Sequence, residues 1–533
     1  MSEKQADQFW AYSVAKEIVK AEKKIYVCEG MWTPSGFFHI GNARPEIFTP
    51  YAVFLALGEL GYPVRQNFIV DDFDAVRKIP QGIGVKQHDE GNFLGYSCAT
   101  APSPVAGYRS WADFFVSDVR EHIAEFGVGL NIISAYQSYK DGKFNDLIHF
   151  SLEHSKEIVS VWNRVAGAEK AADFFPVQVV CGGCKKIYFT QAMQWDGKFV
   201  HYKCAMCGFS GKVLPKDGRV KLHWRVHWVC HWIVHDVSFE SGGKDHFSKG
   251  GSVEVGRALL AEVFKRPPIF QVPTEFVQLK GAKMSGSVGN VISLGDWLEI
   301  ASPELFRFLN FSTRPNSVIE INLEGNNFLL LDERYNRAAR IFFGKENAEN
   351  EKLQEQISRA YRQSIIGKPP KELPVQVPFS FAVLIAQLFD PEKGKKIEEL
   401  LLQTGHVEEK LSKEDSAFLA LRLLRVRNWV EKFAPQEFRV KFLESAKDVD
   451  IKKISPVVKN VFSAVAVAVG KAKNAEELQG EIFAIAKNNL VEPKELFLAL
   501  YNAFLGRDRG PKLGSLVFAV GKEKIIKRLE ELV

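Results

Sequence analysis

The stretch TPSGFFHIGNAR, residues 33–44, follows a short apolar run at residues 25–28. The apolar run is typical of a buried strand, and Thr-Pro-Ser-Gly is typical of a turn. A helix is expected to begin near Gly41, so the stretch predicts a strand-to-helix turn. Unpaired backbone N–H groups at such a turn, with His39 and Asn42 beside them, favour a bound anion such as phosphate.

The helix after this turn contains two prolines. Pro45 suits the first turn of a helix, whereas Pro50 removes a helical hydrogen bond and predicts a kink or a shortened helix. Gly36 and Gly41 would let the backbone approach a ligand closely. A histidine at this place also fits capping or packing, so the turn alone does not establish function.

A second motif, KMSGS at residues 283–287, has the properties of a phosphate-binding loop. Lys283 has a flexible stem, so its charge can follow a polyphosphate as it is cleaved. Ser285 and Ser287 can bond to phosphate oxygens, and Gly286 gives the loop mobility. The two motifs together predict a site for a nucleotide.

The first half of the chain alternates apolar strand-like runs, such as residues 64–70, with helical stretches, which predicts an α/β domain with a parallel sheet. Ligands in such sheets bind at the carboxyl ends of the strands. Residues 174–214 interrupt the alternation and predict a small insertion. After about residue 315 amphipathic helical segments dominate, and the Pro-rich stretch 367–378 is the expected linker.

Four of the seven cysteines form two Cys-x-x-Cys pairs about twenty residues apart. Such pairs converge on a tetrahedral zinc ion, and four thiolates leave no open coordination position. The pattern therefore predicts a structural zinc rather than a catalytic one. Its ligands are Cys181, Cys184, Cys204 and Cys207. Core packing is the expected role of the other three cysteines.

Composition places the chain among ordinary globular proteins: 533 residues, 46% hydrophobic and 25% charged, with a net charge of +6. Lysine runs at 393–396 and 452–453 fit a solvated helix face as well as a phosphate-binding face. No apolar run is long enough to cross a bilayer, and the first residues do not resemble a secretory signal. A cytoplasmic protein without a membrane segment is expected.

The HIGN and KMSGS motifs resemble the two nucleotide-binding motifs of class I aminoacyl-tRNA synthetases, and their surroundings resemble the class I lysyl-tRNA synthetases. The resemblance extends over nearly the whole chain. The segments that carry it are TPSGFFHIGNAR, DDFDAVRKIP (71–80), SAYQSYKDGKF (134–144), GKDH (243–246), LKGAKMSGSVGNVISLGDW (279–297) and ALYNAFLGRDRGPKLGSLVFAVGKE (499–523).

The resemblance implies ATP-dependent ligation of lysine to tRNA(Lys) through a lysyl-adenylate, with ATP, Mg²⁺ and a structural Zn²⁺ as cofactors. It also implies a Rossmann-type catalytic domain at 1–291 with a zinc-binding insertion at 174–214. A connecting helical region at 292–366 and an α-helical anticodon-binding domain at 367–533 would follow.

The resemblance also implies site residues. The catalytic residues would be His39, Asn42, Lys283, Ser285 and Ser287. The ATP-binding residues would be His39, Gly41, Asn42, Gly243, Asp245 and Lys283. The amino-acid pocket would be formed by Gly30, Thr33, Asp72, Trp224 and His246.

Asp72 is predicted to bind the substrate ammonium because a lysine substrate needs a carboxylate, and Asp71, Asp72 and Asp74 follow the strand at 64–70. Helix capping is the alternative role for these aspartates. The chain departs from the family pattern at Gly286, where a serine is common, and at His227, where an aspartate is usual. The segment 30–33 also holds one extra residue.

Two other functions are considered. A cysteinyl-tRNA synthetase would need a catalytic zinc on Cys28 with Cys230, His231 or His235. A non-catalytic tRNA-binding protein of synthetase shape would have no need for both phosphate motifs, and His39, Lys283 and both serines argue against it.

Overall fold

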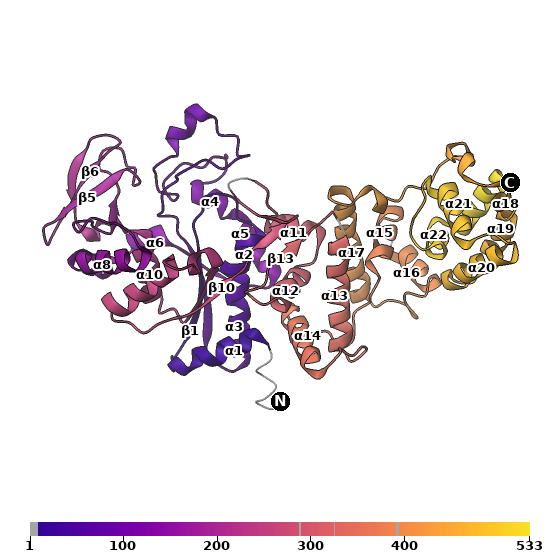
Figure 1. The fold of residues 1–533 in the computed structure, drawn as a ribbon, viewed down its shortest axis with the longest axis horizontal. Helices are drawn as coiled ribbons and strands as arrows, with labels where there is room; N and C mark the ends of the chain where they lie inside the picture. Colours follow the sequence, from indigo (N-terminus) through magenta and orange to yellow (C-terminus); the bar gives the residue numbers. More distant parts are fainter. Residues whose placement is uncertain (1–8, 287–288, 325, 391–393) are drawn as a thin grey trace. The chain divides into compact units, whose positions relative to one another are not determined.

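The computed structural model describes residues 9–286, 289–324, 326–390 and 394–533 (Figure 1). The chain divides into two compact units. The first comprises the described residues up to Asp296 together with Phe306–Ile321 and Asn347–Lys368, and the second comprises Trp297–Leu305, Asn322–Glu346 and Pro369–Val533. Segments of both units alternate between residues 297 and 368, a range that overlaps most of the predicted connecting region at 292–366.

A five-stranded parallel sheet forms the centre of the first unit, which confirms the predicted α/β fold. Its strand order is β10, β9, β1, β2, β3. The strands are β1 (Tyr26–Trp32), β2 (Val64–Val70), β3 (Asn131–Ser134), β9 (Phe239–Gly243) and β10 (Phe270–Thr274). The order reverses between β1 and β9, and sheets of this kind bind ligands at the carboxyl ends of the strands beside such a reversal.

Helices cover both faces of this sheet. Two neighbouring residues of β9, Glu240 and Ser241, point to opposite faces and contact different helical segments. Glu240 accepts hydrogen bonds from Trp228 and Trp232 of α9 (Trp224–Val234). The next residue, Ser241, points to the opposite face and donates to the Pro45 carbonyl oxygen. That second face carries α3 (Thr49–Glu59), which packs on β1, β2 and β9. Further helices of this unit are α1 (Trp10–Ile18), α4 (Trp111–Phe115), α5 (Ser117–His122), α6 (Ala135–Lys140), α7 (Asn145–Glu153), α8 (Ser155–Ala166), α10 (Ser252–Ala258) and α14 (Glu351–Ser364).

The helix after the first motif contains a π turn. α2 (Ile40–Ala43) passes into the π-helical segment η3 (Arg44–Phe48) and then into α3. Pro50 has no N–H group, so it cannot donate to a carbonyl group one turn earlier. Ser241 donates to the Pro45 carbonyl instead. The interruption predicted from Pro50 is therefore present as a π turn, a feature that often occurs at functional sites.

An antiparallel module interrupts the α/β order within the predicted insertion. Its three-stranded sheet is formed by β5 (Thr190–Trp195), β6 (Val200–Cys204) and β7 (Ser210–Val213). β4 (Val177–Val179) and β8 (Val220–Leu222), which flank the module in sequence, pair antiparallel. A further small sheet joins β12 (Ala282–Lys283), β11 (Val277–Leu279) and β13 (Ile319–Ile321).

The second unit is helical, as predicted for the C-terminal part. Buried Trp429 lies in its core, where it donates to the Leu323 carbonyl oxygen at 2.8 Å and stacks on Phe328. Its helices among the described residues are α13 (Asn326–Phe342), α15 (Phe379–Leu388), α16 (Gly394–Gln403), α17 (Lys413–Lys432), α18 (Pro456–Lys459), α19 (Phe462–Lys471), α20 (Ala475–Asn488), α21 (Pro493–Leu505), α22 (Leu513–Val520) and α23 (Lys522–Leu532). α11 (Leu294–Ile300) and α12 (Pro303–Ser312) each have residues in both units. In the part of the chain that the structure describes, no helix combines the length and apolar character needed to cross a membrane.

Candidate active site

His39 occupies the N-cap of α2, directly beyond the carboxyl end of β1. Its Nδ1 accepts a hydrogen bond from the backbone N–H of Asn42 at 3.3 Å. Burial, with a smaller contribution from the charge of Lys283, lowers the pKa of His39 to about 4. The imidazole is therefore neutral near pH 7, and because Nδ1 accepts, Nε2 carries the proton. His39 offers one N–H donor to a ligand.

The second predicted motif lies close to the first. The ammonium of Lys283 on β12 contacts Asp245 Oδ2 at 2.9 Å and lies 3.8 Å from the centre of the Phe276 ring. Met284 is buried, and its terminal methyl carbon would lie 3.3 Å from a Cβ at Gly41. A Cβ at Gly41 would also lie 2.8 Å from Nδ1 of His39, so the absence of a side chain leaves room for the His39 ring as well as for the second motif.

Gly286 has a structural reason for departing from the serine of the family pattern. The Phe37 N–H donates to the Gly286 carbonyl oxygen at 3.3 Å. A Cβ at Gly286 would lie only 2.3 Å from the Phe37 carbonyl oxygen, so a side chain there would push the two segments apart. Ser287, the last residue predicted for this loop, lies outside the described residues.

A cavity of about 290 Å³ opens between the two motifs. Its lining includes the neutral N–H donor of His39, two lysines, two serines and four glycines, a set suited to a polar, negatively charged ligand, together with the carboxylates of Glu46 and Asp245. The predicted nucleotide-site residues that line it are His39, Gly41, Asn42, Gly243, Asp245, Lys283 and Ser285.

A second cavity of about 390 Å³ adjoins the first. The two share five lining residues, namely Trp32, Ser35, Asn42, Glu46 and His246. Of the predicted amino-acid pocket, Thr33, Trp224 and His246 line the second cavity, whereas Gly30 and Asp72 do not. Its remaining walls are strongly acidic, with Asp71, Asp74 and Glu240 besides Glu46.

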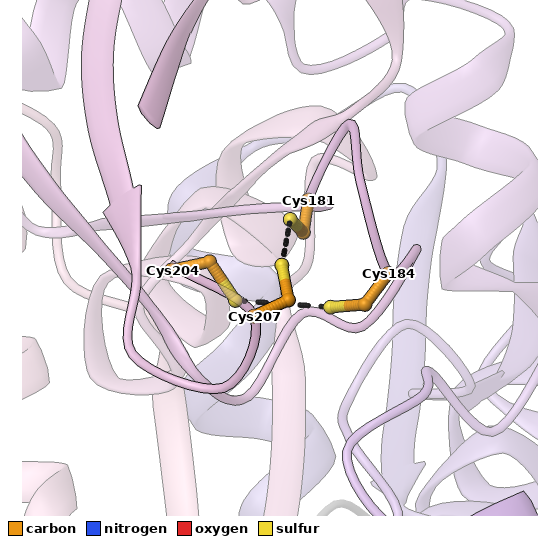
Figure 2. Close-up of side chains that lie close together, drawn as sticks. All are labelled: Cys181, Cys184, Cys204 and Cys207. Atoms are coloured by element: carbon orange, nitrogen blue, oxygen red, sulfur yellow. Dashed lines mark hydrogen bonds between the residues drawn. The ribbon is translucent and has the colours of Figure 1, made fainter. Parts of the chain in front are cut away.

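The four predicted zinc ligands converge (Figure 2). All four sulfur atoms lie within 4.8 Å of one another. The Sγ atoms of Cys181 and Cys207 lie 3.6 Å apart, and those of Cys184 and Cys204 lie 3.7 Å apart. A tetrahedron of sulfurs around zinc at about 2.3 Å has edges of about 3.8 Å, so the arrangement fits a zinc ion with four thiolate ligands.

Comparisons with known proteins identify the family of this chain. A family model described as "tRNA synthetases class I (K)" matches residues 8–364. The lysine–tRNA ligase of Pyrococcus furiosus is 34% identical over 98% of this chain and 99% of its own length. That of Thermococcus kodakarensis is 35% identical with the same coverage. The chain belongs to the class I lysyl-tRNA synthetase family. Among solved structures, a glutamate tRNA ligase from Elizabethkingia meningosepticum aligns over 96% of this chain and 99% of its own, with 14% identity and a TM-score of 0.38.

The metal site expected of a cysteinyl-tRNA synthetase does not form in this family member. Cys28 and Cys230 are buried, and burial raises the pKa of both thiols. Within the described ranges, the four module cysteines are the only group of three or more potential ligands close enough together to hold a metal.

The predicted aspartate cluster is occupied by a lysine from within this synthetase. Lys221 is fully buried, lies 3.1 Å from Asp71 Oδ1 and also bonds to Asp74. Burial opposes ionisation of Asp71, but the charge of Lys221, together with hydrogen bonds from Lys221 and His227, holds its pKa well below the usual range. His227, the departure noted in the sequence, lies 3.3 Å from Asp71 and 2.8 Å from the Tyr139 hydroxyl.

Asp72 has a capping role in this synthetase. It accepts hydrogen bonds from the Ser134 hydroxyl at 2.6 Å and from the Tyr136 N–H at 2.7 Å, both at the start of α6. Burial raises its pKa to about 6, against the effect of these bonds. Its role as the partner of the substrate ammonium stays a prediction, but this position outside the cavity lining does not favour it.

Sequence reasoning missed a row of polar residues across the sheet, of which Glu29, Asn67 and Glu240 are buried. Glu29 and Glu240 are register partners on β1 and β9. Asn67 of β2 donates to Glu29 at 3.1 Å, and Asn131 of β3 donates to Asn67 at 3.0 Å. Burial raises the pKa of Glu240 to about 8 and that of Glu29 well above its usual value. These residues alternate with apolar neighbours along their strands. Because such alternation ordinarily indicates an apolar buried face and a polar exposed face, the sequence did not indicate their burial.

Gly30 supports the π turn from β1. A Cβ on Gly30 would lie 2.0 Å from the Glu46 carbonyl oxygen, a contact with backbone that cannot move aside cheaply. We expect Gly30→Ala to lower stability by about 1–3 kcal/mol through overpacking. Thermal unfolding of the two proteins measures this change.

The matched control for this change is Gly129→Ala. No atom lies within 4 Å of the position of a Cβ at Gly129, so its unfolding midpoint should stay close to that of the parent. Equal unfolding midpoints for Gly30→Ala and Gly129→Ala would show that the close approach of β1 to η3 does not limit the stability of the protein.

Proposed function

We propose that this protein ligates L-lysine to tRNA(Lys) in an ATP-dependent reaction through a lysyl-adenylate. The observation that carries the proposal is the pair of adjoining cavities. One is lined by both phosphate-binding motifs and the other by carboxylates and aromatic rings. The family and the lysine–tRNA ligases to which the chain is similar support the same reaction.

The lysine carboxylate attacks the α-phosphate of ATP where the two cavities meet. His39 donates its Nε2 proton in a hydrogen bond to a phosphate oxygen, and Asn42 assists beside it. Lys283, Ser285 and Ser287 follow the pyrophosphate as it leaves. Catalysis then consists of positioning and of stabilising phosphate charge, without a covalent enzyme intermediate.

The remainder of the nucleotide site is assigned by position. Gly243 is the last residue of β9 and Asp245 lies just beyond it, so that Gly243 leaves room for the ribose and Asp245 accepts hydrogen bonds from its hydroxyl groups. Gly41 leaves backbone open toward the phosphates. ATP enters as its Mg²⁺ complex, since magnesium binds substrate phosphates and keeps several waters.

The terminal ribose of tRNA(Lys) then attacks the lysyl-adenylate. Cys181, Cys184, Cys204 and Cys207 would hold a zinc ion in the antiparallel module formed by β5, β6 and β7. This module supports tRNA binding. We assign anticodon binding to the helical region 367–533.

Amino-acid-dependent exchange of labelled pyrophosphate into ATP, measured with each amino acid in turn, tests the proposal. Exchange with lysine alone, followed by charging of tRNA(Lys), is the expected result. A non-catalytic tRNA-binding protein would show no exchange, and exchange with a different amino acid would replace lysine as the substrate.

A further inference from the structure

The four carboxylates that line the second cavity fall into two pairs, which differ in how their charge is balanced. Asp71 and Asp74 share the ammonium of Lys221, and Arg77 lies 3.5 Å from Asp74. Two negative groups therefore face two positive groups from this chain. The Asp71 side of the cavity is already neutral.

Glu46 and Glu240 have hydrogen-bond donors but no cation. Glu46 accepts from the Met31 N–H at 3.0 Å. Glu240 accepts from the indole N–H groups of Trp228 at 2.8 Å and Trp232 at 2.6 Å. None of these donors is charged, and neither carboxylate forms an ion pair with a described residue. A buried carboxylate without a counter-charge is costly, so a positive ligand would be favoured here.

The neighbouring walls are aromatic. The rings of Trp224 and Trp228 stack with centroids 5.8 Å apart, and His246 lies edge-on at 5.9 Å and 5.4 Å from them. Aromatic faces accommodate methylene groups and attract an organic cation. A metal ion fits less well, because among the described residues no group of three or more side chains that includes these carboxylates lies close enough together to hold one.

We propose that Glu46 and Glu240 bind the side-chain ammonium of the amino-acid substrate, an assignment that depends on the function proposed above. Glu240 is only 2% exposed. A long side chain reaches a carboxylate at this depth, while the main-chain end of the substrate stays at the junction with the nucleotide cavity. The ammonium supplies three N–H donors and the missing positive charge.

Binding of the substrate ammonium to Glu240 should depend on pH. The groups around Glu240 are Glu29 on β1, Glu46 on η3, Gln271 on β10 and the two indoles of α9, so no cation opposes protonation. Burial raises the pKa of Glu240 to about 8. A protonated carboxyl binds ammonium poorly, so lysine binding releases a proton. The KM for lysine should fall as pH rises toward about 8, by up to about tenfold per pH unit.

Glu240→Gln and Glu46→Gln test the proposal. Each keeps the shape of the side chain and removes its charge. We expect the KM for lysine in pyrophosphate exchange to rise about 10- to 100-fold, with the KM for ATP nearly unchanged. The preference for lysine over norleucine, which has the same methylene chain without the ammonium, should fall by a similar factor. In Glu240→Gln the pH dependence of the lysine KM should flatten.

Glu29→Gln is the matched control, since Glu29 is equally buried in the same row but does not line the cavity. An equal loss in this variant, or an unchanged preference over norleucine in both test variants, would overturn the assignment while leaving the lysine activity of the parent intact. If Glu240→Gln does not fold, the half-buried Glu46→Gln gives the same comparison. A parent without lysine-dependent exchange would instead contradict the proposed function, and the carboxylate pair would then require another substrate with a cationic side chain.

Discussion

Lys283→Ala is expected to slow formation of the lysyl-adenylate by about 10² to 10³, while lysine binding stays nearly unchanged. The side chain of Lys283 is 54% exposed, and its ammonium contacts Asp245 and the face of Phe276. Both partners border the nucleotide cavity rather than the acidic one. The charge is therefore placed to meet the pyrophosphate as it develops in the transition state, and its loss lowers the rate rather than the affinity for lysine.

Single-turnover formation of adenylate, followed with labelled ATP, measures this effect. Lys244→Ala is a closely matched control, because Lys244 also lies near the Phe276 ring, at 4.9 Å, and pairs with Glu275 at 2.8 Å. It does not line the nucleotide cavity, so its rate should match that of the parent. Equal rates for Lys283→Ala and Lys244→Ala would remove Lys283 from the chemical step.

The parts of the site that could be predicted from sequence are those encoded within short segments. His39 and Asn42 lie three residues apart, the module cysteines occur in pairs, and both patterns indicate their chemistry without knowledge of the fold. The rule that ligands bind at the carboxyl ends of parallel strands also pointed to Asp71 and Asp74, which line the second cavity. These predictions depend on local spacing and on one general property of α/β sheets.

The missed features depend on contacts between distant segments. Lys221, which neutralises Asp71, lies 150 residues further along the chain. The role inferred for Glu240 depends on the pairing of β9 with β1, and on the finding that the donors to its carboxylate are uncharged. The three neighbouring aspartates Asp71, Asp72 and Asp74 could not be told apart from sequence. Their roles depend on which neighbouring strand or helix supplies a donor.

The π turn shows the same limit at a smaller scale. Pro50 predicts a missing hydrogen bond, but its consequence depends on two residues elsewhere. Gly30 lets the carbonyl oxygen of Glu46 approach β1, and Ser241 donates to the carbonyl of Pro45. The turn also brings the Glu46 side chain to the Met31 N–H. The π turn thus places the carboxylate of Glu46 at the junction of the two cavities.

Zinc removal is expected to abolish most tRNA charging while leaving lysine-dependent pyrophosphate exchange largely intact. The inner face of the module sheet is apolar, with Ala192, Val200 and Tyr202 buried. The two Cys-x-x-Cys loops are otherwise held by hydrogen bonds, among them those from the Gly182 N–H to the Tyr202 hydroxyl at 2.8 Å and from the Cys204 N–H to the Phe209 carbonyl oxygen at 2.9 Å. A structural zinc contributes about 10–16 kcal/mol in small zinc domains, so its loss should loosen these loops.

The two activities should separate because the module carries charges suited to a polyanion. Residues 177–213 contain five lysines and one aspartate. Both cavities, in contrast, are lined by residues outside this range. Cys207→Ser should therefore contain less than one zinc per chain by elemental analysis and show a fall of about 10² in kcat/KM for tRNA, with adenylate formation changed less than about threefold. A parent protein purified without chelators and found to lack zinc would contradict the assignment. Equal losses of exchange and charging would show instead that the module stabilises the catalytic sheet rather than the binding of tRNA.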